Sequence, residues 1–188
     1  MKKIALICLL IGGTLLSGSD YKEFVGLGYG QTKGTFKTSS LTAESGNEDT
    51  YSLRAGFVND ISRIYLNLDY LNADDSSGLD EKWYTLELNL EGKTSPYKLT
   101  KYLSTSFFVG GHVGLVKVDL DTSAPYPIYS DNKTDAIYGL QTGLLMELPS
   151  NFELEIGYKY SWSSLTFESI DLDLDRVKRY YIAVNYRF

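Results

Sequence analysis

The chain has 188 residues, a length that suits one domain. Its formal net charge of −6 excludes a general nucleic-acid-binding role, because binding to phosphate backbones requires a basic surface. After residue 16, no apolar stretch approaches the ~20 residues that a transmembrane helix requires. Any membrane crossing by the rest of the chain would therefore use strands.

The first 19 residues have the three parts of a secretory signal peptide. Two lysines supply a positive start, an apolar run continues to residue 16, and small residues at 17–19 offer a cleavage site. Cleavage after Ser19 would leave residues 20–188 as a mature barrel domain without cysteine, because Cys8 is the only one. A first helix that anchors the protein in a membrane is the alternative. A lipoprotein signal fits less well, because Cys8 lies inside the apolar run.

The rest of the sequence alternates apolar and polar residues with period two, as strands with one apolar face do. Tyr84, Leu86 and Leu88 share one face of such a segment, for example, and Glu87 lies on the other. The alternation predicts eight strands, at residues 21–33, 50–58, 63–71, 81–91, 103–116, 135–148, 152–162 and 175–188.

The phase of the fifth segment is ambiguous, because it contains pairs of like residues. The favoured interpretation places Phe107 and Val109 on the apolar face, with Phe108 and His112 on the polar face. A bulge at the neighbouring glycine pair would reverse part of this pattern.

The last nine residues carry the clearest alternation. One face collects the apolar side chains Tyr180, Ile182, Val184, Tyr186 and Phe188. This pattern is typical of the closing strand of a barrel whose outside touches lipid and whose inside is polar. The sequence therefore predicts an all-β fold, an eight-stranded antiparallel up-and-down transmembrane β-barrel. A soluble lipocalin-like barrel, with the apolar face inside, is the alternative.

The connections between the strands alternate in length, which favours the membrane barrel. Long, polar and mostly acidic connections are predicted at 34–49, 72–80, 119–134 and 163–174. Most of the others are short, although 92–102 is longer than this rule prefers. Outer-membrane barrels place long loops outside the cell and short turns in the periplasm, with both termini periplasmic. Aromatic residues at the ends of the apolar stretches predict two interfacial girdles that include Tyr51, Phe57, Phe152, Trp162 and Tyr186.

If the apolar faces point outward, the charged residues of the strands lie inside the barrel. Buried ions must pair, because an isolated charge in a poorly solvated interior is very costly. We expect a lumen ion-pair network of Arg54, Asp69, Glu87, Glu153, Glu155, Lys159 and Arg179. In it, Arg54 and Arg179 would meet Glu87 and Glu155 across the lumen. The network would fill and fix the interior, and control of a gate is the alternative role.

Catalytic chemistry has little support in the sequence. The single histidine, His112, has no serine beside it and is predicted to lie in the lumen, hydrogen-bonded to a carboxylate. Asp171, Asp173 and Asp175 begin the pattern of a calcium loop, but its glycine and closing glutamate are missing. We therefore predict no catalytic residue, no cofactor and no metal.

The stretch before the last strand is expected to continue that strand above the membrane. Ile170, Leu172 and Leu174 would keep the outward parity and form an apolar edge that a partner strand could join. Arg176 and Lys178 would lie just above the apolar band, where they would contact phosphate groups of lipopolysaccharide. Two solvated charges at a strand end are the alternative.

Taken together, these features resemble the small eight-stranded outer-membrane barrels, the group of the OmpA transmembrane domain, OmpX and the opacity-type surface proteins. The resemblance extends from Tyr21 to Phe188 and rests on the signal segment, the strand count, the loop asymmetry and the C-terminal strand. It implies a protein of the Gram-negative outer membrane. It also implies that the barrel-assembly machinery recognises the C-terminal strand, through Tyr180, Ile182, Val184, Tyr186 and Phe188.

The resemblance does not select one function. We expect a non-enzymatic integral outer-membrane protein, structural or adhesin-like, whose acidic extracellular loops bind a host or surface partner. Its other expected partners are outer-membrane lipid and lipopolysaccharide, and it would be a monomer. A narrow porin-like channel is the alternative, followed by a lipid A-modifying enzyme, because some small outer-membrane barrels carry out that chemistry.

Overall fold

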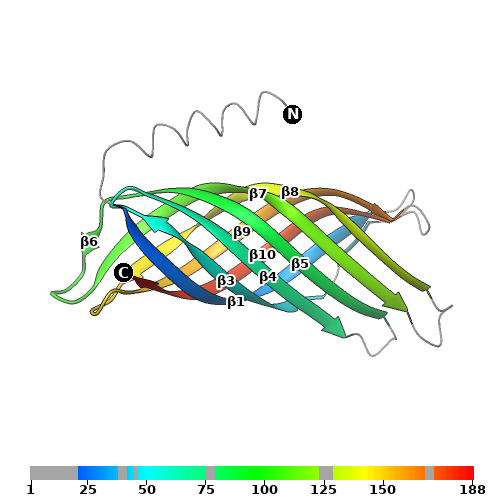
Figure 1. Cartoon of the computed structure of the whole chain (residues 1–188), viewed down its shortest axis with the longest axis horizontal. Helices are drawn as coiled ribbons and strands as arrows, with labels where there is room; N and C mark the ends of the chain where they lie inside the picture. The colour runs from blue at the N-terminus through cyan, green and yellow to red at the C-terminus, as the bar shows by residue number, and fades with distance from the viewer. Residues whose placement is uncertain (1–20, 38–41, 45, 75–78, 123–128, 168–171) are drawn as a thin grey trace, which may run out of the picture.

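A computed structural model shows a closed barrel whose strands are tilted relative to its axis (Figure 1). It describes residues 21–188 except 38–41, 45, 75–78, 123–128 and 168–171. The predicted signal peptide and the predicted apolar residue Ile170 therefore lie outside the described residues. Within the described ranges, no helix is long and apolar enough to cross a membrane.

Eight long strands form the barrel in the part of the chain that the structure describes. They are β1 (Lys22–Lys37), β3 (Glu48–Val58), β4 (Ser62–Asp74), β5 (Leu79–Lys93), β7 (Ser104–Thr122), β8 (Tyr129–Glu147), β9 (Phe152–Phe167) and β10 (Leu172–Arg187). Two short strands, β2 (Thr42–Glu44) and β6 (Tyr97–Lys98), pair with β1 and β7. Each long strand runs antiparallel to the next, and β10 pairs with β1 to close the sheet. The predicted fold class is confirmed.

The stagger of the strands fixes the width of the barrel. A path that follows the pairing from Lys22 once around the barrel returns to β1 at Thr32, ten residues further along. With strands ~4.8 Å apart and a rise of ~3.3 Å per residue, this stagger tilts the strands by about 40° and gives a backbone radius of about 8 Å. Side chains alone can fill a lumen of that size.

The end of the barrel that carries Lys22 and Phe188 is called the base here, and the opposite end the far end (left and right in Figure 1). At the base, β8 and β9 join through Ser150 and Asn151, whose φ angles of 64° and 66° suit a tight hairpin turn. The connection from β5 to β7 is longer and contains β6, also at the base.

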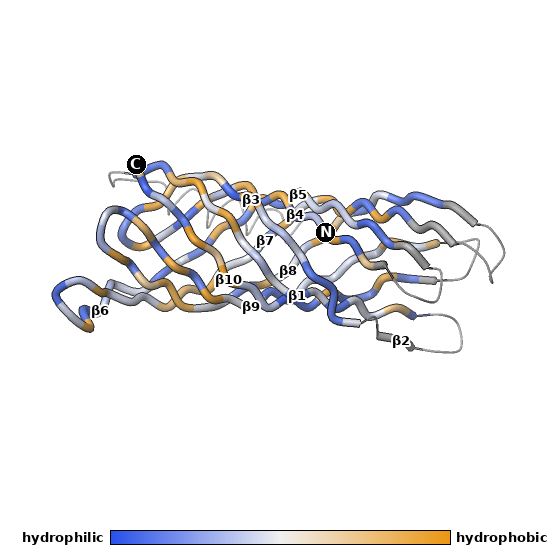
Figure 2. Tube along the Cα trace, turned by 90° about the horizontal axis from the view of Figure 1, so that it is seen from below, coloured by the Kyte–Doolittle hydropathy of each residue, from blue (hydrophilic) through white to orange (hydrophobic). Residues whose placement is uncertain are grey.

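Along the basal part of the strands, hydrophobic and hydrophilic residues alternate, as Figure 2 shows. Most of the apolar side chains there face outward, as the sequence predicts for all eight segments, whereas Phe24, Val58 and Tyr65 form a small buried cluster. The structure also settles the phase of β7, where Phe107 is 49% exposed and Phe108 is fully buried. The pairing of β7 with both neighbours passes Gly110 and Gly111 without a shift, so no bulge occurs there.

Aromatic rings border this outward apolar band on both sides. On the far side, cross-strand pairs form between Tyr29 and Tyr51, Tyr70 and Tyr84, Tyr138 and Trp162, and Tyr158 and Tyr180. On the basal side, the ring of Tyr186 contacts those of Phe152 and Phe188. These are the two girdles that the sequence predicts.

Beyond the far girdle, the strands continue much further than predicted. Residues 34–37, 72–74, 119–122, 129–134 and 163–167 were expected in loops but belong to strands. The ladder between β7 and β8, for example, extends to the pair Thr122 and Tyr129. Polar residues in these stretches hid the strands, because the apolar face there is inside rather than outside.

The inside of the far end is an apolar core. Its buried side chains, which come from seven of the strands, are Phe36, Leu71, Ala73, Trp83, Val116, Val118, Ile137, Leu165, Phe167, Leu174 and Val177. The barrel thus reverses its polarity along its axis: apolar outside and polar inside near the base, apolar inside at the far end.

This reversal corrects the expected apolar edge before the last strand. Leu174 is fully buried in the far core rather than exposed, because the pairing of β10 with β9 shifts between Leu174 and Arg176. The extra residue, Asp175, changes the parity of everything before it. The side chain of Leu172 lies outside the described residues.

Candidate functional site

The lumen between the base and the far core holds an unusual concentration of buried charge. Within the described ranges, the buried cations are Arg54, Arg63, Lys93, Lys159 and Arg179, and the buried carboxylates are Asp69, Glu87, Glu91, Glu153 and Glu155. Five formal charges of each sign therefore balance. Ten ions can remain in such an interior only if they contact one another closely.

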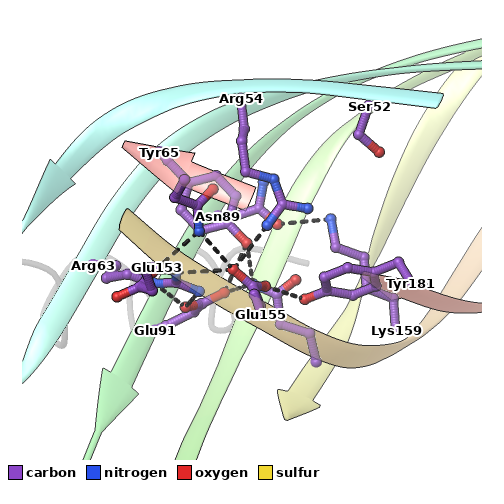
Figure 3. A network of polar contacts seen from close by, with 12 residues as sticks. Ser52, Arg54, Arg63, Tyr65, Asn89, Glu91, Glu153, Glu155, Lys159 and Tyr181 are labelled. Atoms are coloured by element: carbon purple, nitrogen blue, oxygen red, sulfur yellow. Dashed lines mark hydrogen bonds and ion pairs between the residues drawn. The ribbon is translucent and has the colours of Figure 1, made fainter. Parts of the chain in front are cut away.

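Arg63 on β4 is the centre of this network near the base (Figure 3). Its Nη1 atom lies 2.9 Å from a carboxylate oxygen of Glu153 and 2.9 Å from one of Glu155. Its Nε atom donates a 2.7 Å hydrogen bond to Glu91. One guanidinium thus joins three carboxylates, because its planar fork offers donors in several directions.

Arg54, on the neighbouring strand β3, contacts one of the same carboxylates, that of Glu155. Its Nη1 atom lies 2.9 Å from Oε2 of Glu155. Its guanidinium carbon lies 5.4 Å from the ring centroid of Tyr65 and 5.1 Å from that of Tyr181. The Tyr181 hydroxyl in turn donates a 2.6 Å hydrogen bond to Glu155. Two cations and a phenol therefore hold one buried carboxylate.

A second group of ions lies nearer the far core. Lys159 Nζ donates to Glu87 at 2.5 Å and to Oδ1 of Asn89 at 3.0 Å. Arg179 forms an ion pair with Asp69 and donates from Nε to the Thr32 hydroxyl at 2.9 Å.

All seven residues of the expected lumen network lie inside the barrel. Two of these residues, Arg179 and Glu87, have partners other than those expected. Arg54 meets Glu155, but Arg179 bonds to Asp69, and Glu87 bonds to Lys159. Sequence reasoning also missed the central role of Arg63. The alternation places Arg63 inside the barrel, but it does not tell which inward ions lie at the same level along the barrel axis.

Glycines on the lumen face make room for the large side chains. A Cβ atom at Gly157 on β9 would overlap the ring of Tyr181, and one at Gly26 on β1 would overlap the amide of Asn185. Asn185 uses that space to donate to Glu153 at 3.1 Å. The alternation of glycine with bulky residues thus allows the packed interior of the basal half.

His112 on β7 lies in the same lumen, but its partner is not the expected carboxylate. Nε2 lies 2.8 Å from the Ser161 hydroxyl, and the nearest Glu87 oxygen is 3.9 Å away. A serine–histidine–acid triad needs its acid at the other ring nitrogen. Among the described residues, no hydrogen-bond partner reaches His112 Nδ1. His112 and Ser161 are both buried and form part of the packed interior.

Arg176 and Lys178 lie on the outer face of β10, beside the far girdle. Arg176 Nε donates to Asp175 at 2.6 Å, and Lys37 Nζ lies 3.0 Å from the same carboxylate. The hydrogen bond from Lys37, helped by Arg176, lowers the pKa of the Asp175 carboxyl. Lys178 pairs directly across the ladder with Lys33, and both line a shallow cleft of about 220 Å³ with Tyr180.

The expected assembly residues of the C-terminal strand all lie on the outside. Tyr180, Ile182, Val184, Tyr186 and Phe188 are exposed beside the outward residues of β1.

Comparison with known proteins assigns this architecture. The barrel is similar to Neisserial surface protein A, with a TM-score of 0.65 and 14% sequence identity over 88% of this chain and 97% of that chain. It is also similar to Ail, the attachment invasion locus protein of Yersinia pestis, with a TM-score of 0.54 and 16% identity over 90% of this chain and 99% of that one. OprH of Pseudomonas aeruginosa gives a TM-score of 0.51 and 25% identity, over 89% and 99% of the two chains.

A search of curated proteins found no match to the sequence. The family model of the outer membrane protein beta-barrel domain, in contrast, matches residues 6–188, nearly the whole chain. The outward apolar band, the two aromatic girdles and the charged lumen are the features that such a protein needs in a bilayer. The chain belongs to the outer membrane protein β-barrel family.

Proposed function

We propose that the protein is a sealed, non-enzymatic surface barrel that acts as a structural element of the outer membrane. The observation that carries this proposal is the filling of the lumen. Ion pairs centred on Arg63 and Arg179 occupy the basal part, and the apolar core around Leu165 and Phe167 occupies the far end. Water and ions would have to cross two layers with opposite chemistry.

Conductance in planar bilayers tests this proposal. The purified protein should give no stable channel steps, whereas a narrow pore would give uniform steps that depend on the concentration of salt. A variant with Leu165→Ala and Phe167→Ala opens the far core and serves as a comparison. If the unaltered protein itself gives stable, uniform steps, the lumen is not sealed and the pore becomes the better assignment.

An acidic far end favours adhesion as a second role. The four chain segments that connect strands there, residues 33–49, 74–82, 117–135 and 168–178, contain fifteen Asp and Glu against seven Lys and Arg. Because ordered strands carry much of this charge, a basic partner would meet a preformed surface with little loss of conformational freedom.

Binding of a basic probe tests adhesion separately from sealing. Vesicles that contain the protein should bind polylysine, and binding should weaken as salt is raised. Sucrose octasulfate, an anionic compound present in a complex of Ail, should not bind. The opposite preference would contradict the proposed role of the acidic far end.

Arg176 and Lys178 support a proposed contact with lipopolysaccharide phosphates. They lie beside the far girdle, at the height where headgroups begin, and Lys33 brings a further positive charge opposite Lys178. Replacement of Arg176 and Lys178 by glutamate should weaken binding of purified lipopolysaccharide. Lys22→Glu, at the exposed start of β1 at the base, is the control. Unchanged binding in the Arg176 and Lys178 variant would leave them as solvated charges.

A further inference from the structure

The connection between β5 and β7 forms a distinct arm at the base, residues 94–103, which is called the basal arm here. It is ordered by its own backbone hydrogen bonds. Thr94 N donates to Phe107 O and Leu99 N to Leu103 O, each at 2.9 Å. Within it, Tyr97 and Lys98 pair with the start of β7 as strand β6. Figure 1 shows the arm projecting past the end of the barrel.

The basal arm exposes more apolar surface than a segment in water would be expected to. Tyr97 is 70% exposed, Tyr102 65% and Leu99 53%. Tyr97 is paired directly with Thr105, so the two side chains point to the same face of the sheet. Two residues further along, Phe107 is part of the outward apolar band on that face. The apolar side of the arm therefore extends the membrane-facing surface beyond the base of the barrel.

The charge of the arm is the opposite of that of the whole chain. No Asp or Glu occurs between Glu91 and Asp119, whereas the arm itself contains Lys98 and Lys101. Lys101 lies 5.4 Å from the ring centroid of Tyr102, so its charge remains beside an aromatic face. Lysines combined with tyrosines and a leucine form the side-chain mixture that prefers the boundary between headgroups and acyl chains.

We infer that the basal arm lies on the periplasmic leaflet of the outer membrane and binds anionic phospholipid headgroups. Tyr97 and Leu99 would enter the headgroup boundary below the basal girdle, and Lys98 and Lys101 would contact the phosphates. This inference rests on the proposed function only for the placement of the barrel in a bilayer. Anionic lipid fits the arm better than a protein partner, because Tyr97 lies on the same face of the sheet as the lipid-facing band that begins at Phe107.

Spin labels at single cysteines test the inference in reconstituted vesicles. The label is attached at Thr100→Cys, at the tip of the arm, in a chain that also carries Cys8→Ser. A label at Asp60→Cys, in the turn between β3 and β4 at the same end, reports a position in water. A label at Leu66→Cys, in the outward band, reports insertion of the barrel. Accessibility to oxygen and to a water-soluble nickel chelate gives the depth of each label.

In vesicles that contain phosphatidylglycerol, the label at position 100 should be shielded from nickel, in contrast to the label at position 60. Each lysine near an anionic surface favours the bound state by a factor of about five, so Lys98→Gln with Lys101→Gln should lower the ratio of bound to free arm by about thirty-fold. Lys82→Gln with Lys117→Gln, near the far end, should change nothing. In vesicles of phosphatidylcholine alone, the label at position 100 should lose its shielding from nickel, as it does in the Lys98→Gln and Lys101→Gln variant.

The inference is overturned if position 100 is as accessible to nickel as position 60 while position 66 remains in lipid. It is also overturned if shielding depends on the amount of protein per vesicle, which would indicate a second copy as the partner. A failure of the sealed-barrel proposal would appear in conductance instead and would leave these depths unchanged.

Discussion

Arg54 Nη1 lies 2.9 Å from Oε2 of Glu155, and both side chains are almost completely buried. The pair joins β3 to β9 through the lumen, across strands that share no backbone ladder. It therefore ties opposite walls of the barrel together, which neighbouring-strand hydrogen bonds cannot do.

Replacement of Arg54 by methionine should destabilise the barrel strongly. It removes one of the cations from a buried carboxylate, and breaking a buried ion pair on one side costs about 3–5 kcal/mol. Because Glu155 keeps its contacts with Arg63 and Tyr181, a value near the lower limit is expected. Urea unfolding in lipid vesicles measures the change in the free energy of unfolding.

Lys117→Met is the matched control for this prediction. Lys117 forms a 2.9 Å ion pair with Asp119, but its side chain is 46% exposed. An exposed pair contributes less than about 1 kcal/mol. If both variants showed the same small decrease in the free energy of unfolding, the lumen ions would be solvated rather than packed.

Gly157→Ala should disturb the lumen by adding a single methyl group. The new Cβ atom would overlap the Tyr181 ring, which would have to move away from Glu155. Overpacking of this kind typically costs about 1–3 kcal/mol. Gly111→Ala is the control, because its Cβ would meet its nearest atom, Gly139 O, at an ordinary 3.4 Å. Equal urea midpoints for the two variants would contradict the packing described.

Two leucine substitutions should distinguish the far core from the lipid-facing band. Leu165 is fully buried in the far core, whereas Leu66 is 54% exposed on the outside. Leu165→Ala should create a cavity that costs about 2–5 kcal/mol and should speed amide hydrogen exchange in the far parts of β9 and β10. Leu66→Ala should leave exchange there unchanged. Faster exchange in the Leu66 variant alone would mean that the polarity of the far end is not reversed.

The bulge at Asp175 should show a characteristic pH dependence. Its carboxyl has a pKa below the usual value because Lys37 and Arg176 donate to it. A carboxylate whose folded pKa is lowered stabilises the fold above its unfolded pKa of ~3.9 and loses that contribution as pH falls through the folded pKa. Carboxyl carbon NMR should therefore show Asp175 titrating below ~3.9. Lys37→Gln should raise this pKa, and Lys33→Gln should leave it unchanged.

The period-two pattern sufficed to predict the basal half of this protein. Leu66, Leu86 and Ile182 face outward as expected, because one buried and one lipid-facing side leave only one acceptable parity. Charged residues inside the barrel followed from the same alternation. Pairing partners did not follow, because the height of each ion depends on strand stagger. Ser161 meets His112 from 49 residues away through the registers of β7, β8 and β9.

The far half was harder to predict for a physical reason. Its strands project beyond the lipid, so water replaces acyl chains outside and the apolar side moves inward. Val116, Ile137 and Leu165 therefore have the parity that the basal half reserves for polar residues. The basal phase extends correctly to these three residues, but it gives the wrong face for Leu174, because an extra residue intervenes in β10. The bulge at Asp175 turns the Leu174 side chain inward. In the sequence this bulge is visible only as one added residue.

The closing ladder between β1 and β10 has a consequence for biogenesis. Phe24 on β1 pairs with Arg187 on β10, and Tyr29 pairs with Ile182. The first strand to be synthesised therefore cannot form this ladder until the last strand is available. Throughout that interval its edge offers unsatisfied amides to any other nascent chain, a known route to aggregation. We therefore expect the unfolded polypeptide to depend on a holding chaperone before insertion, and we expect slow, all-or-none closure of the barrel in the bilayer.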